Sequence, residues 1–279
     1  MMKLRTTIFI ALFSLSLTAS NSYAGLSLMC SMFPVYDFTR QVARELADVK
    51  LLMRPGTEPH DYEPSTGDIM TLNNSDIFIF TGTNMETWAA DISRSLSNTI
   101  IVDASEGITL TGNDPHIWLD LSLAQKMVMN ISSALAKADP NNAQSFTKNA
   151  EEYCTHLQEL DEAFTAMKKD KALVFAGEFS AGYFMRRYGF DYVSAYDGEN
   201  EPSVRRMAIV IKHIRENGTR YIFADYGGIT QVTRSISSET GVEVLTFGTG
   251  HNVPDTSTTF LQIMLENFNN IKEAMNDGN

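Results

Sequence analysis

The segment NNAQSFTKNAEEYCTHLQELDEAFTAMKK, Asn141 to Lys169, has apolar residues at spacings of three and four from end to end. No Gly or Pro interrupts it, and Pro140 stands where a helix can begin, so the pattern predicts one long helix. At about 1.5 Å per residue this helix is roughly 40 Å long. A single coiled-coil strand would show the same spacing. Its place inside an α/β chain favours a helix that joins two lobes.

Short apolar runs that resemble buried parallel strands alternate with helical patterns before this segment. Strands are predicted at 26–32, 49–53, 76–81 and 99–102, and a helix at 36–46. Alternation of strands and helices is typical of a parallel α/β sheet. The first half of the chain is therefore expected to form one such lobe.

The same alternation resumes after the long helix, without a convincing internal repeat in the sequence. The predicted elements are strands at 172–177, 192–195, 221–224 and 243–247, and helices at 181–188, 204–215 and 260–275. The predicted fold class is α/β, with two parallel-sheet βα lobes joined by one long rigid helix. We place the N-terminal lobe at 25–140, the linking helix at 141–169 and the C-terminal lobe at 170–279.

The first 24 residues have the features of a secretory signal peptide. A basic start at Lys3 and Arg5 precedes an apolar run of about ten residues, which is too short to span a bilayer. The apolar run is followed by small residues at the positions that a signal peptidase requires, and we expect cleavage after Ala24. The mature protein is therefore predicted to be periplasmic. The 34 acidic against 22 basic residues, a net charge of −12, argue against nucleic acid or anionic lipid as partners.

The two cysteines, Cys30 and Cys154, fall in a predicted strand and in the long helix. An exported protein can form disulfides. Small buried side chains are nevertheless common at such positions, so we expect unpaired thiols.

Polar residues that can bind a metal follow several predicted strands, where parallel sheets bind their ligands. His60 follows the second strand, and His116 is expected to begin the helix after the fourth. In the second lobe, Glu178, Asp225 and His251 each follow a strand. The first lobe thus supplies two imidazoles, and the second supplies one imidazole and carboxylates. Together these groups form a complete set of ligands for Zn²⁺ or Mn²⁺. We therefore predict a metal site in the cleft between the lobes.

Each candidate also has a purely structural interpretation. His60 and His251 could be ordinary loop histidines, His116 could cap a helix, and Glu178 could pair with a nearby arginine. Asp225 is more readily a neighbour of a ligand than a ligand. Two further histidines are expected on solvated helix faces: His156 and His213.

Three motifs resemble the periplasmic zinc- and manganese-binding proteins of ABC importers. They are PGTEPHDYEPS at 55–65, DPHIWLD at 114–120 and GYFMRRYG at 182–189. FPVYDF at 33–38 resembles the family's first strand-to-helix corner. EPS at 201–203 resembles the Glu-Pro-Ser that opens a helix of the second lobe. The likeness extends over essentially the whole mature chain, in the family's order, and implies the family's fold of two lobes linked by a long helix.

The resemblance implies a ligand set. His60 and His116 match the two first-lobe histidines, and Glu178 occupies the third position, where zinc members usually carry His and manganese members often carry Glu. The family's fourth ligand is an Asp after the last strand. This chain has FGTGH at 247–251 instead, so His251 is the expected substitute and Asp225 the reserve.

The expected function is that of a solute-binding protein, not an enzyme. It would capture a divalent metal, zinc first and manganese next, and deliver it as a monomer to the membrane subunit of an ABC permease. One alternative is a secreted zinc-dependent hydrolase with the same ligands, although His-Glu-x-x-His and Gly-x-Ser-x-Gly are absent. Another is a surface adhesin on this scaffold.

Overall fold

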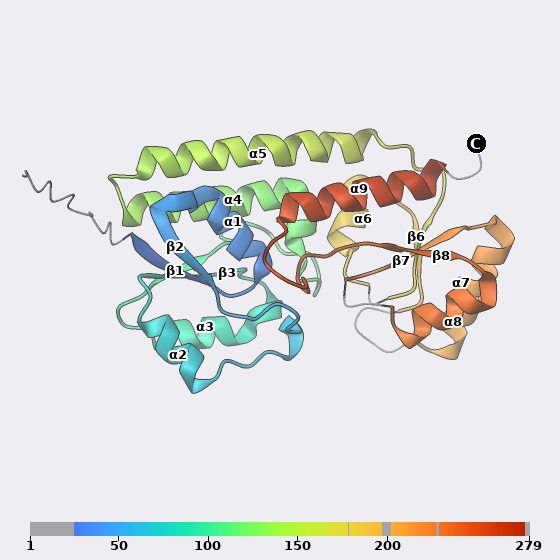
Figure 1. Ribbon diagram of the computed structural model, residues 1–279, viewed down its shortest axis with the longest axis horizontal. Helices are drawn as coiled ribbons and strands as arrows, with labels where there is room; N and C mark the ends of the chain where they lie inside the picture. Colours follow the sequence, from blue (N-terminus) through green and yellow to red (C-terminus); the bar gives the residue numbers. More distant parts are fainter. Residues whose placement is uncertain (1–24, 178, 197–201, 227–228, 277–279) are drawn as a thin grey trace, which may run out of the picture.

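The computed structural model describes residues 25–177, 179–196, 202–226 and 229–276 (Figure 1). The predicted signal peptide at 1–24 and the candidate ligand Glu178 lie outside these ranges, as does Glu201 of the EPS motif. The lobe boundaries placed at 140 and 170 remain a prediction.

The first sheet consists of β1 (Leu26–Cys30), β2 (Ala47–Leu51), β3 (Ile77–Phe80) and β4 (Ile100–Asp103). All four strands are parallel, in the order β2-β1-β3-β4. Cys30 at the end of β1 lies opposite Leu51 on one side and Ile79 on the other. Strand β2 thus lies on one side of β1, whereas β3 and β4 follow on the other side. The loops after β1 and β3 therefore lie next to each other at the carboxyl edge of the sheet.

Helices cover both faces of the first sheet (Figure 1). They are α1 (Phe33–Ala43) and α4 (Leu121–Ala138) on one face, and α2 (Thr66–Asn73) and α3 (Thr87–Ser93) on the other. Short 3-10 turns lie between these elements: η1 (Arg44–Leu46), η2 (Pro59–Asp61), η3 (Asn84–Glu86) and η4 (Ile117–Leu119). Leu72 is the buried residue of α2 and Ala89 that of α3. So narrow a buried face leaves little periodicity in the sequence.

His116 does not begin the helix after β4, contrary to the sequence prediction. It directly precedes η4, and α4 begins at Leu121. The reason is the side chain of Asp120, which accepts hydrogen bonds from the backbone N–H groups of Ser122 and Leu123. An aspartate that satisfies these free donors is a strong helix N-cap, and it fixes the start of α4 beyond His116.

The second sheet repeats the strand order of the first, although the sequence shows no repeat. Its strands are β5 (Leu173–Phe175), β6 (Tyr192–Ser194), β7 (Tyr221–Ala224) and β8 (Glu243–Thr246), all parallel in the order β6-β5-β7-β8. The helices are α6 (Gly182–Tyr188), α7 (Val204–Asn217), α8 (Gln231–Thr240) and α9 (Phe260–Asn276). The α/β fold of two parallel-sheet lobes is confirmed.

Helix α5 (Ala143–Ala166) runs along both lobes, as the periodicity of its sequence predicts (Figure 1). It packs against α1, α4 and α9. One hydrophobic cluster continues from Leu28 in the first sheet through Leu157 and Phe164 of α5 to Phe247 after β8. Because this core does not stop between the sheets, α5 and α9 hold the two lobes against each other.

Cys30 and Cys154 are not bonded to one another. Cys30 is buried in β1, and burial raises the pKa of its thiol to about 12. Among the helices within the described ranges, none has the length and apolarity that a bilayer crossing requires.

Candidate metal centre

Three histidines from separate loops lie together at the carboxyl ends of the two sheets. His60 is part of η2 after β2, His116 lies between β4 and η4, and His251 follows β8. The ring centroids are 5.8 Å apart for His60 and His116, 6.2 Å for His60 and His251, and 5.2 Å for His116 and His251. The structure therefore brings together the three histidines that the sequence singled out, two from the first lobe and one from the second.

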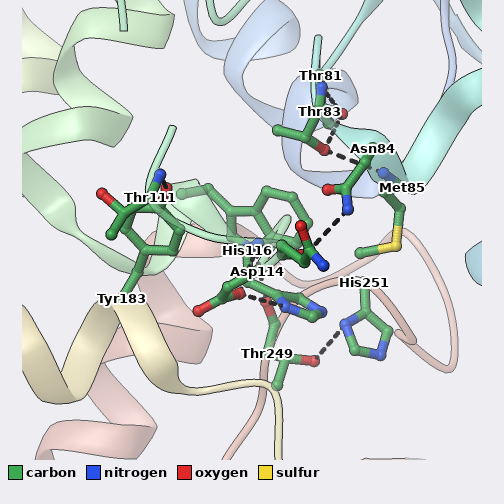
Figure 2. Close-up of polar contacts among 12 residues, drawn as sticks. Thr81, Thr83, Asn84, Met85, Thr111, Asp114, His116, Tyr183, Thr249 and His251 are labelled. Carbon is green, nitrogen blue, oxygen red and sulfur yellow. Dashed lines mark hydrogen bonds and ion pairs between the residues drawn. The ribbon is translucent and has the colours of Figure 1, made fainter. Parts of the chain in front are cut away.

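Asp114 orients the imidazole of His116 (Figure 2). Asp114 Oδ1 lies 2.9 Å from His116 Nδ1 and also accepts a hydrogen bond from the His116 backbone N–H at 3.1 Å. A carboxylate only accepts hydrogen bonds, so Nδ1 is the protonated ring nitrogen. Nε2 is buried and has no hydrogen-bond partner in the described structure. This lone pair is available to a metal ion.

The charge state of Asp114 suits this role. Burial opposes its ionisation, but the hydrogen bonds from His116, together with the charge of Arg186, outweigh burial and lower the pKa of Asp114. The carboxylate is therefore ionised at neutral pH. A histidine whose second nitrogen is bonded to a carboxylate is the usual arrangement of a metal-binding imidazole.

His251 is held by a relay through Thr249 (Figure 2). His251 Nδ1 lies 3.1 Å from Thr249 Oγ1, and the Thr249 hydroxyl donates to Asp225 Oδ2. Burial, followed by the charges of His116 and His60, lowers the pKa of His251 well below its ordinary value. The imidazole is consequently neutral, which is the form that binds metals.

Asp225 also reaches the group of histidines. Its Oδ2 lies 3.8 Å from His251 Nε2, and its Oδ1 accepts hydrogen bonds from the backbone N–H groups of Tyr226 and Thr249. Burial raises the pKa of Asp225, although the hydrogen bonds from Thr249 and Tyr226 oppose the shift. Asp225, the alternative fourth ligand predicted from the sequence, thus lies beside His251, the preferred one.

The loop of His60 is shaped by its own sequence and by the second lobe. Glu58 caps η2 by accepting from the His60 backbone N–H, and Pro59 occupies the first turn. Gly56, with a φ of 78°, donates its N–H to the carbonyl of Val253 at 3.0 Å. Since a positive φ favours glycine, this residue allows the first-lobe loop to meet the segment that follows His251.

Within the described ranges, no three His, Cys, Asp or Glu side chains lie close enough to hold an ion as they stand. Glu178, the predicted third ligand, is not among the described residues. His156 is exposed on α5, 3.6 Å from Glu159, and His213 lies beside Asn217 on α7, so neither belongs to the group.

Asp114 and Thr249 contact the candidate histidines but were not among the residues predicted from the sequence. Asp114 stands in the quoted DPHIWLD motif, and an acidic residue two positions before a candidate histidine is a signal for such a role. Thr249 carries no comparable signal, because its contact with Asp225 joins the loop after β8 to the loop after β7.

A model of the family described as "Zinc-uptake complex component A periplasmic" matches residues 28–274. The chain belongs to this family. It is 30% identical to the high-affinity zinc uptake system protein ZnuA of Bacillus subtilis, over 90% of this chain and 88% of that protein. It is 32% identical to the zinc-binding protein AdcA of Streptococcus pyogenes, over 77% of this chain but only 48% of that protein. The chain thus spans about half the length of the AdcA relative.

Solved structures agree with this assignment. The Zn(II)-bound ZnuA-like domain of Streptococcus pneumoniae AdcA is 28% identical and has a TM-score of 0.78, over 90% of this chain and 98% of that domain. The laminin binding protein Lmb of Streptococcus agalactiae, described as bifunctional with adhesin and metal transporting activity, is 26% identical and has a TM-score of 0.81. The alignment with Lmb covers 90% of this chain and 99% of that chain.

The family consists of solute-binding components of zinc uptake systems, not of enzymes. The expectation that this chain is not an enzyme is confirmed, and the hydrolase alternative is set aside.

Proposed function

We propose that the chain is the periplasmic solute-binding protein of a zinc importer, which captures Zn²⁺ between its lobes and delivers it to an ABC permease. The observation that carries the proposal is the meeting of His60, His116 and His251 from both lobes. The zinc-binding names of the related proteins support the choice of ion.

The distances between the rings suit one shared ion after a small movement. Two imidazoles that bind zinc at about 2.1 Å in a tetrahedral site have centroids on the order of 5 Å apart. His116 and His251 already lie at 5.2 Å. The longer distances of 5.8 and 6.2 Å both involve His60, so the loop of His60 closes on the ion by about 1 Å.

The ligand set proposed here is His60, His116 and His251 with one carboxylate. Asp225 is the described carboxylate nearest to His251, whereas the part of Glu178 rests on the sequence alone. Three imidazoles favour zinc over manganese, because manganese prefers oxygen ligands and binds more weakly to any such site. Manganese is therefore the second choice of ion.

Capture is an exchange of ligands. Neutral imidazoles and a carboxylate replace the water molecules of the ion, and no covalent chemistry is involved. Because the ligands come from both lobes, separation of the lobes when a permease docks would remove some of them and release the ion. The likeness to Lmb, described as having adhesin activity as well, makes binding to a host protein a second candidate function.

Metal titration tests the proposal. The apo protein is titrated with zinc and with manganese by native mass spectrometry, and zinc affinity is measured by competition with a chelator. We expect one zinc per chain that excess manganese does not displace. His60→Ala and His116→Ala should each lower zinc affinity by more than about 100-fold while the far-UV circular dichroism is unchanged.

The matched control is His156→Ala, which removes an exposed histidine of α5 and should leave the affinity unchanged. Equal affinity in wild type, His60→Ala and His116→Ala would contradict the proposed site. Binding of laminin by metal-free protein, without zinc uptake, would favour the adhesin candidate.

A further inference from the structure

Asp114 connects a histidine of the first lobe to an arginine of the second. Its Oδ1 is 2.9 Å from His116 Nδ1, and its Oδ2 accepts a hydrogen bond from Arg186 Nη2 at 3.3 Å. Arg186 belongs to α6. One carboxylate with 20% of its side chain exposed therefore contacts both lobes next to the three histidines.

The start of α6 is packed directly against this carboxylate. Gly182 is the first residue of α6, and a methyl group built on it would collide with Asp114 Oδ2 and would lie 3.1 Å from Arg186 Nη1. Only glycine allows this close approach. Arg186 also makes a cation–π contact with Tyr183, with the guanidinium carbon 4.5 Å from the ring centroid.

We propose that Asp114 is a positioning residue for metal capture and that Arg186 keeps it in place from the second lobe. By accepting a hydrogen bond from His116 Nδ1–H, Asp114 leaves the lone pair on Nε2, the buried nitrogen that has no hydrogen-bond partner in the described structure. This inference rests on the proposed function, because it assigns Nε2 of His116 to the ion.

The contact between Asp114 and Arg186 makes a first-lobe ligand sensitive to the position of the second lobe. When α6 lies against the first lobe, Arg186 holds Oδ2, and Oδ1 stays aimed at the imidazole. When α6 moves away, Oδ2 loses Arg186, and the carboxylate is held only by its contacts with His116. The imidazole is then less firmly oriented, so the affinity for the ion falls as the lobes separate.

The Asp114→Asn variant tests the positioning role. With its oxygen kept on Arg186, its NH₂ group takes the place of Oδ1 and can donate to Nδ1, which moves the ring proton to Nε2 and leaves the His116 backbone N–H without this acceptor. Long-range ¹H–¹⁵N NMR spectra of the metal-free protein report which nitrogen carries the proton. We expect Nδ1–H in wild type, a shift towards Nε2–H in Asp114→Asn, and a loss of zinc affinity of about 10- to 100-fold.

The Arg186→Gln variant tests the link between the lobes, with Tyr183→Phe as the matched control. We expect Arg186→Gln to lower zinc affinity about fivefold and to speed zinc dissociation. Tyr183→Phe keeps the ring under Arg186 and removes only the hydroxyl that accepts from the Thr111 N–H at 2.7 Å, so its affinity should stay at the wild-type value. An equal loss in Tyr183→Phe would assign the effect to general contact between the lobes and overturn the link.

The design separates failure of this inference from failure of the proposed function. If His60→Ala binds zinc as wild type does, the site itself is wrong. If His60→Ala loses affinity while Asp114→Asn keeps both the wild-type tautomer and the wild-type affinity, the site stands and the positioning role is wrong.

Discussion

Trp118 Nε1 donates a hydrogen bond to the carbonyl oxygen of Thr249 at 2.7 Å, and both residues are buried. Trp118 follows His116 by two residues in the first lobe, and Thr249 precedes His251 by two residues in the second. The bond therefore joins the two loops that carry the closest pair of histidine rings, which are 5.2 Å apart. This contact therefore helps to fix the distance between His116 and His251.

Loss of that bond should destabilise the protein. Trp118→Phe leaves the buried Thr249 carbonyl without its donor, at a cost of about 1–3 kcal/mol in the free energy of unfolding. The matched control is Trp88→Phe, which removes a similar volume from a half-buried indole whose Nε1 has no hydrogen-bond partner among the described residues. Urea denaturation of the metal-free proteins measures both. Equal losses in the two variants would show that the hydrogen bond adds nothing beyond packing.

His251 and Asp225 should differ in their contribution to metal binding. We expect His251→Ala to lower zinc affinity more than Asp225→Ala, because His251 presents a neutral imidazole while both oxygens of Asp225 are engaged by backbone and hydroxyl donors. His213→Ala on α7 serves as the control histidine and should bind as wild type. Chelator competition gives the order. The reverse order would make Asp225 the ligand and His251 its neighbour.

Glu86 should make stability depend on pH. It is buried, and burial raises the pKa of its carboxyl group above the ordinary value of 4.5, against the hydrogen bonds from the backbone N–H and hydroxyl of Thr81. A raised pKa means that the folded state holds the proton more tightly than the unfolded state does. The stability that Glu86 contributes is therefore present below pH 4.5 and is lost as pH rises through its folded pKa.

The Glu86→Gln variant measures this contribution, because its side chain stays neutral. The unfolding free energy of Glu86→Gln should rise relative to that of wild type as pH rises. The difference grows by about 1.4 kcal/mol per pH unit in the range where Glu86 is protonated in the folded state and ionised in the unfolded state. Urea denaturation of the metal-free proteins at several pH values from 5 to 8 is the measurement. A difference that does not change across this range would mean that Glu86 ionises normally in the fold.

Arg187 should anchor α6 to α5. Its guanidinium donates to the buried carboxylate of Asp161 at 2.5 and 3.0 Å, and Tyr188 donates to the same group at 2.8 Å. Arg187→Met should lower the unfolding free energy by about 2 kcal/mol, less than for a fully buried pair because 35% of the Arg187 side chain is exposed. Thermal unfolding compares it with Arg215→Met, which breaks an exposed pair with Glu239 and should change little.

Periodicity predicts the long helix and the strands of both sheets. The long helix is found at Ala143–Ala166, and the eight predicted strands are all present, with ends that differ by a few residues. Helices α2, α3 and α8 were not predicted; α2 and α3 each bury a single residue, and α8 buries Thr233 and Ile236. Helix α4 begins at Leu121 and not at His116, because the side chain of Asp120 caps it there.

The sequence by itself determined the two α/β lobes, the helix that joins them and the identity of three histidines that meet. Periodicity, strand length and the polar residues that end each strand are local properties, so they can be read along the chain. Only the tertiary structure decided that Asp114 meets Arg186 and that Trp118 meets Thr249, because these partners lie 72 and 131 residues apart. No local rule relates such residues; their meeting follows from how α5 and α9 pack the two sheets against each other.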